Sequence, residues 1–92
     1  MSDYKVGEIP YHKRPKKQMT ELLTKYRSES GMGRLVMMAN LREYVRLQDP
    51  FVLQDEVRGI SDEQDLNVLL GVGMKGFLYY EVIRQKAKSV GM

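Results

Sequence analysis

The stretch over residues 61–89 constrains the fold more than any other, because it combines the densest apolar run with the only cluster of glycines. Its apolar residues recur every three or four positions, which is the spacing of one buried helix face. These residues are Leu66, Leu69, Leu70, Met74, Phe77, Tyr80 and Ile83. The pattern predicts a terminal helix over residues 62–89 that is bent or broken within 71–76, and the continuity of the stripe favours a single helix.

The three clustered glycines also match a nucleotide-binding pattern. Gly71, Gly73 and Gly76 spell G-x-G-x-x-G, which in a dinucleotide-binding unit lets the backbone approach a pyrophosphate. Such a unit needs about 30 residues and an acidic residue about 20 positions beyond the glycines, whereas only 16 residues follow Gly76. We therefore interpret the glycines as helix-packing positions, a notch or hinge, and expect no cofactor and no small-molecule ligand.

Two helices are predicted before residue 50. The first covers residues 16–30, where the apolar spacing of one buried stripe occurs at Met19, Leu22, Leu23 and Tyr26. The second covers residues 34–48, where a shared face carries Met37, Met38, Leu41, Tyr44 and Val45. Leu35, Val36 and Leu47 widen this apolar arc beyond what one surface helix needs. A broad arc implies contact on two sides, with other helices or with another subunit.

A short helix is predicted over residues 51–58. Asp49 is a suitable N-cap and Pro50 suits a first helical position, while Ser61 and Gln64 have the spacing of a capping box for the terminal helix. The sequence thus predicts an all-α fold of three to four helices, forming a single helical domain over residues 16–92.

These apolar faces are the predicted helix-packing or partner-interface positions. They comprise Met37, Met38, Leu41, Tyr44, Gly71, Gly73, Gly76, Phe77 and Tyr80. A continuous terminal helix of 27 residues would be about 40 Å long, which exceeds what a chain of 92 residues can cover by itself. This length favours a second copy of the chain as the partner.

Residues 1–15 are predicted to form an extended basic arm. Pro10 and Pro15 restrict the residues before them to extended conformations. Residues 1–17 carry five Lys or Arg against two carboxylates, a net charge of +3, whereas residues 18–92 carry ten of each sign. The candidate contacts to nucleic acid or another anionic partner are Lys5, Tyr11, Lys13, Arg14, Lys16 and Lys17. Cations with interleaved aromatic rings suit phosphates and stacked bases.

The composition argues against several other classes of protein. The chain has no cysteine and one histidine, so thiolate chemistry is excluded, and neither a metal site nor an enzyme is expected. Its longest uncharged apolar-rich run, residues 66–74, is far shorter than the about 20 residues that span a bilayer. The expected setting is cytoplasmic or inside a macromolecular assembly, neither secreted nor transmembrane.

Two functions remain open at this point. The first is a non-enzymatic assembly protein, either a homo-oligomer or a subunit of a larger assembly, which associates through apolar helix faces while its arm reaches a neighbouring subunit or nucleic acid. The alternative is a small DNA- or RNA-binding module whose arm supplies the phosphate contacts.

Overall fold

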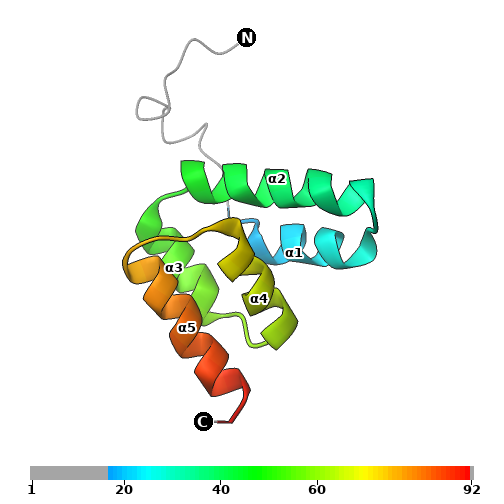
Figure 1. The fold of residues 1–92 in the computed structure, drawn as a ribbon. Coiled ribbons are helices and arrows are strands. Elements are labelled where there is room, and N and C mark those ends of the chain that lie inside the picture. The colour runs from blue at the N-terminus through cyan, green and yellow to red at the C-terminus, as the bar shows by residue number, and fades with distance from the viewer. Residues whose placement is uncertain (1–16, 92) are drawn as a thin grey trace, which may run out of the picture.

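The computed structural model describes residues 17–91, which form five helices. In chain order these are α1 (Met19–Ser28), α2 (Met32–Leu47), α3 (Pro50–Arg58), α4 (Glu63–Val72) and α5 (Phe77–Ser89) (Figure 1). The all-α prediction is confirmed for this part of the chain, but there is one helix more than expected. The arm predicted over residues 1–15 lies outside the described residues.

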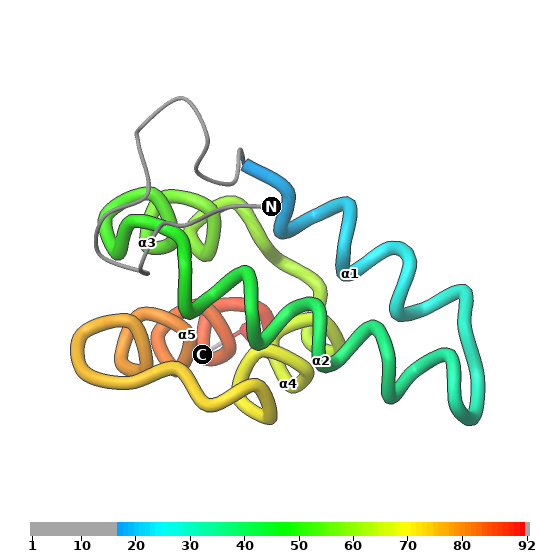
Figure 2. The backbone as a smooth tube through the Cα atoms, turned by 90° about the horizontal axis from the view of Figure 1, so that it is seen from above, coloured from blue at the N-terminus to red at the C-terminus, as the bar shows by residue number. Residues whose placement is uncertain are grey.

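The helices form two packed groups. Helices α1 and α2 are an antiparallel hairpin, which runs across one end of the other three helices (Figures 1 and 2). Helices α3 and α5 run side by side in the same direction, and α4 runs back between them in the chain. One buried cluster connects the two groups, and every helix contributes to it. Its members are Met19, Leu23, Leu41, Tyr44, Leu53, Val57, Ile60, Leu66, Leu69, Val72, Met74, Leu78 and Val82.

The helix predicted over residues 62–89, bent or broken within 71–76, is broken there into α4 and α5. The single continuous helix that the apolar stripe favours is wrong, because the chain reverses between α4 and α5. Gly73 ends α4 with a left-handed φ of 94°, and Gly76 precedes α5 with a φ of 66°. Residues with a Cβ rarely adopt such angles, so glycine is favoured at both positions. An added Cβ at either glycine would have no atom within 4 Å. These two glycines therefore permit a turn and do not form a helix-packing notch.

Gly71 lies within α4, where an added Cβ would be 3.9 Å from Met38 Cε, an ordinary contact with α2.

The longest helix is α2, with 16 residues, so the argument for a second copy from helix length no longer holds. No helix in the described part of the chain is long and apolar enough to cross a membrane.

The helix ends follow local capping chemistry. Asp49 caps α3 by accepting from the backbone N–H groups of Phe51 and Val52, as the sequence predicts. Helix α4 is capped by Asp62, which accepts from Gln64 and Asp65, and not by Ser61. Helix α1 is shorter than predicted, because Gln18 supplies no side-chain cap and Glu29 is already extended. Helix α2 instead begins two residues earlier than predicted, at Met32.

Candidate interaction surfaces

A polar clamp fixes the point at which the arm joins the body. Lys17 Nζ lies 2.7 Å from Asp55 Oδ2, and the backbone N–H of Met19 donates to Glu56 Oε2 at 3.0 Å. The Tyr44 hydroxyl donates to Glu56 Oε1 and accepts from the backbone N–H of Gln18 at 3.0 Å. Glu56 and Tyr44 thus satisfy backbone donors at the start of α1 that no local side chain caps.

The environment of this clamp shifts two pKa values. Burial, reinforced by the hydrogen bond to Glu56, raises the pKa of Tyr44 to about 12. The hydrogen bond and charge of Asp55 raise the pKa of Lys17, so this lysine stays a cation. Lys17 is the one predicted arm contact that the structure describes, and it is paired with a carboxylate. Lys5, Tyr11, Lys13, Arg14 and Lys16 lie outside the described residues.

Helix α2 leaves an apolar stripe on the outer side of the molecule. Met32, Leu35 and Val36 are 75%, 65% and 57% exposed, and the small Ala39 continues their line. We call Met32, Leu35, Val36 and Ala39 the α2 stripe. On the opposite side of the helix Leu41 and Tyr44 are buried in the core, while Met37 and Met38 are half-buried. The apolar arc of α2 is therefore divided, with one part in the core and the other open.

The charges around the α2 stripe are balanced. Glu43 and Arg46 form an ion pair within the helix. The Glu29 carboxylate lies against Gly33 at the start of α2, close to the first turn of the stripe. Arg42 makes no ion pair with any residue in the described range 17–91. The surface of another protein can therefore approach the α2 stripe without meeting a strong electrostatic field of one sign.

A second apolar surface covers the N-terminal ends of α3 and α5. The rings of Phe51 and Phe77 stack with centroids 5.8 Å apart and an angle of 27° between their planes. Phe51 and Tyr80 are 72% and 69% exposed. Tyr79 packs edge-on against Tyr80, and Ile83 lies one turn further along α5. We call Phe51, Phe77, Tyr80 and Ile83 the aromatic face.

A buried carboxylate fixes the two helices beneath the aromatic face. Glu81 is only 3% exposed and lies 3.2 Å from Arg58 Nε and 3.6 Å from an Arg84 guanidinium nitrogen. Gln54 Nε2 donates to the same oxygen at 3.4 Å. A buried carboxylate needs such partners, because unpaired burial of a charge is costly. Glu81 therefore sets the register of α3 against α5.

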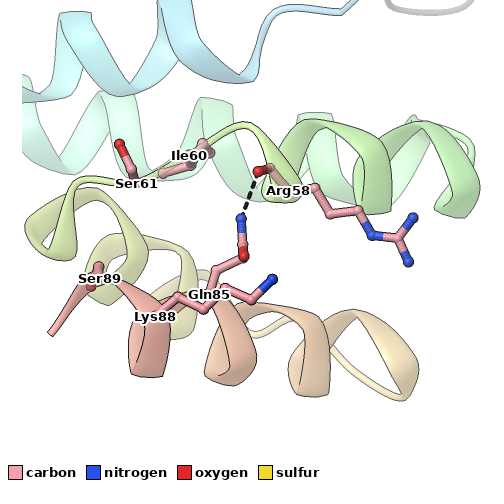
Figure 3. A pocket seen from close by; sticks show the side chains of 6 residues that line it. All are labelled: Arg58, Ile60, Ser61, Gln85, Lys88 and Ser89. Carbon is pink, nitrogen blue, oxygen red and sulfur yellow. Dashed lines mark hydrogen bonds between the residues drawn. The ribbon is translucent and has the colours of Figure 1, made fainter. Parts of the chain in front are cut away.

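A cleft of about 330 Å³ lies at the other end of these two helices (Figure 3). It is lined by Arg58, Ile60, Ser61, Gln85, Lys88 and Ser89. The Gln85 amide rises from α5 and donates to the Arg58 carbonyl at 2.6 Å, which caps the C-terminus of α3. The side chains of Lys88 and Ser61 have no hydrogen-bond or ionic partner among residues 17–91. The lining of the cleft thus includes an ammonium group and, on the opposite wall, a hydroxyl group that have no partners in the described chain.

Sequence reasoning located only part of these surfaces. Of the predicted interface residues, Phe77 and Tyr80 are on the aromatic face, Leu41 and Tyr44 are in the core, and Gly73 and Gly76 form the turn between α4 and α5. Phe51, Ser61 and Lys88 were not predicted as site residues. The sequence did contain a signal for the exposure of Phe51. This residue lies two positions before Leu53, which places it on the side of the short helix that faces away from the core.

Comparison of the chain with protein-family models, curated proteins and solved structures gave no match. The described fold and surfaces define a small all-α protein with two exposed apolar surfaces and a cationic cleft. Within the described residues, no group of three or more His, Cys, Asp or Glu side chains could hold a metal ion.

Proposed function

We propose that this chain is a non-enzymatic assembly protein that associates with a second copy of itself through the α2 stripe. The observation that carries the proposal is the exposure of three large apolar side chains at i, i+3 and i+4 on the outer side of the longest helix. Exposed residues that are scattered singly need no explanation. A continuous helical stripe, in contrast, is the geometry by which helices pack on each other.

The charges favour an antiparallel pair of α2 helices. A two-fold axis between Leu35 and Val36 places Met32 of one copy opposite Ala39 of the other, and the small Ala39 allows close approach. The same axis brings the part of α2 that carries the unpaired Arg42 towards the first turn of the second copy, where the Glu29 carboxylate lies against Gly33. An isologous interface of this kind closes on itself and gives a dimer.

The expected dimer is weak. Stable interfaces bury about 800 Å² per partner, and a stripe of four residues on one helix buries less. Its centre is apolar, while its flanks carry Glu29, Arg42 and the Glu43–Arg46 pair. Apolar centres with polar rims are the normal anatomy of interfaces. We therefore expect association that depends on concentration, with the arm available to reach the neighbouring subunit.

Sedimentation equilibrium of the full chain over a range of concentrations tests the proposal. The apparent mass should rise above the 10.7 kDa of one chain as concentration increases. Val36→Glu should hold the protein at the monomer mass, because a carboxylate would be buried in an apolar contact. Thr20→Glu adds the same charge to the exposed side of α1 and should leave association unchanged.

A charge exchange tests the antiparallel geometry. Arg42→Glu should weaken association by placing two carboxylates opposite each other, and Glu29→Arg combined with Arg42→Glu should restore it. A protein that stays at 10.7 kDa at every concentration would contradict self-association. Association that Val36→Glu does not change would place the interface elsewhere.

Nucleic-acid binding through the arm is the second candidate function. The observation that favours it is the anchoring of Lys17 on Asp55, which places the root of a basic segment beside α3. Deletion of residues 1–16 should then abolish binding, and the affinity of the full chain should fall steeply with salt. Equal binding by the truncated protein would remove this role for the arm.

A further inference from the structure

We propose that the aromatic face and the cationic cleft together bind single-stranded nucleic acid, with bases stacked on the exposed rings and a phosphate at Lys88. This site lies on α3 and α5, so it is separate from the α2 stripe and does not depend on self-association. It also differs from the arm, because folded residues of the body form it.

Helices α3 and α5 both carry aromatic residues near the N-terminal end and cations near the C-terminal end of their exposed side. Along α5, Phe77, Tyr80, Arg84 and Lys88 follow one another at intervals of three or four residues, so they lie in a row on one side of the helix. Along α3, Phe51 and Arg58 lie at the two ends of the same side. Helices α3 and α5 run in the same direction (Figure 1). Phe51, Phe77 and Tyr80 therefore lie towards one end of the surface, and Arg58, Arg84 and Lys88 lie towards the other.

The aromatic end is suited to stacking. Phe51 and Phe77 support each other in a stacked pair, while most of the Phe51 ring surface stays exposed. Tyr80 lies one turn beyond Phe77 and is held from the side by Tyr79. Rings that are fixed by neighbours and open on one side accept any base, because every base has a π surface.

The cationic end is suited to a phosphate. Figure 3 shows Lys88 and Gln85 between α5 and the connection from α3 to α4, with Ser61 on the opposite wall. The Lys88 ammonium and the Ser61 hydroxyl are donors without partners in the described chain. Residues 77 and 88 are separated by about 16 Å along the helix at 1.5 Å per residue. A few nucleotides of an extended strand can connect the two ends.

The charge distribution favours an anionic occupant over a second copy. On α5 and the turn before it, residues 75–91 carry Lys75, Arg84, Lys86 and Lys88 against Glu81, a net charge of +3, whereas α3 and its cap, residues 49–58, carry Asp49, Asp55 and Glu56 against Arg58, a net charge of −2. The positive charge of this surface therefore comes from α5. Two copies meeting through this surface would bring their cations together. The Lys17 ammonium pairs with Asp55 on α3, which lies between Phe51 and Arg58 in sequence, so the described chain begins beside α3.

The arrangement favours nucleic acid over a lipid surface. A helix that lies on an anionic membrane buries an apolar side along its whole length and points its cations into the headgroups. Here the rings and the free cation are separated along the helix axis, and the cation lies in a cleft between two segments of the chain. Discrete stacking and phosphate positions match a nucleotide chain better than a flat interface.

Fluorescence anisotropy with a labelled oligothymidylate tests the proposal on the full chain. Phe51→Ala and Tyr80→Ala should each weaken binding by about 5- to 150-fold, which is the fold-change equivalent of the free energy of stacking one base. Lys88→Gln should weaken binding and reduce the slope of log affinity against log salt by about 0.7, the value for one lost phosphate contact on a single strand.

Two matched variants serve as controls. Met32→Ala removes an exposed apolar side chain from the α2 stripe, and Lys25→Gln removes an exposed cation from α1. Both should bind the oligonucleotide like the unchanged protein. Val36→Glu should also bind normally, so failure of self-association and failure of nucleic-acid binding can be told apart.

Two results would overturn the inference. If Phe51→Ala, Tyr80→Ala and Lys88→Gln all bind the oligonucleotide as the unchanged protein does, the body does not contribute this site and the arm accounts for the affinity. If the protein binds phosphatidylserine vesicles through these residues but has no affinity for the oligonucleotide, the occupant is a membrane surface. The variants alter exposed side chains, so loss of the fold does not obscure either result.

Discussion

The hydroxyl of Tyr44 connects three parts of the molecule through a single atom. Its ring is buried in the core, while its oxygen donates to Glu56 on α3 and accepts from the backbone of Gln18 and the side chain of Gln48. A buried polar atom with this many partners is costly to remove, because the partners lose their hydrogen bonds as well. Tyr44 therefore positions the first turn of α1 and the root of the arm.

Tyr44→Phe should lower the free energy of unfolding by about 1–3 kcal/mol at neutral pH, because buried donors and acceptors lose a partner. It should also change the response to alkali. The pKa of Tyr44 is raised from 10.0 to about 12 in the folded protein, so this contribution to stability is present below pH 10 and is lost as the pH rises towards 12. Urea denaturation across this range should show a shallower decline for Tyr44→Phe.

Tyr80→Phe is the matched control for this experiment, because Tyr80 is exposed on α5. It should retain the decline of the unchanged protein between neutral pH and pH 12. If Tyr44→Phe declines as steeply as the control, ionisation of this tyrosine does not set the alkaline limit, and deprotonation of lysines would account for it.

The turn between α4 and α5 determines the arrangement of the last three helices. Gly73 and Gly76 allow the chain to reverse, and Met74 between them is buried in the core. The three glycines of this segment therefore have different physical roles. Gly71 is helical, while Gly73 and Gly76 have positive φ angles.

Alanine substitutions should separate these roles. Gly73→Ala should destabilise the protein by about 1–2 kcal/mol, the cost of a left-handed conformation for an L-residue. Gly71→Ala should stabilise it by up to about 1 kcal/mol through helix propensity, since the added Cβ meets Met38 at an ordinary distance. Thermal or urea denaturation measures both effects.

Gly73→Asn is a useful control, because asparagine tolerates the left-handed region better than alanine. It should cost less than Gly73→Ala. Equal stability of Gly71→Ala and Gly73→Ala would contradict the turn and would support a continuous helix through this segment.

The helices and caps were predictable where the signal is local. Asp49-Pro50 starts α3 as expected, and the apolar spacing locates α1 and α2 to within a few residues. A break within residues 71–76 was one of the predicted outcomes, but a single helix was favoured over it, because α4 and α5 bury their stripes in the same core and the combined pattern resembles one helix. The cleft was also beyond prediction, since Ser61 and Lys88 become neighbours only after the chain reverses twice.

At the scale of the whole molecule, the hairpin of α1 and α2 is attached to the other three helices by the shared core and by a few polar contacts. One contact is the clamp at Tyr44 and Glu56. Another is the pair between Arg27 on α1 and Asp65 on α4, in which Asp65 is mostly buried and Arg27 is partly exposed. The two ends of α1 are thus fixed to different helices, which keeps the outer side of α2 at a defined position.

The unequal burial of Arg27 and Asp65 predicts an unequal response to mutation. Arg27→Ala leaves a buried carboxylate without its cation, whereas Asp65→Ala leaves a guanidinium that water can reach, so Arg27→Ala should lower the urea midpoint more. The exposed pair of Lys17 and Asp55 is the control, because removing either partner should have a similarly small effect. Equal losses for Arg27→Ala and Asp65→Ala would show that the burial of Asp65 does not determine the cost of breaking this pair. Losses as small as those at Lys17 and Asp55 would show that the pair does not hold α1 to α4.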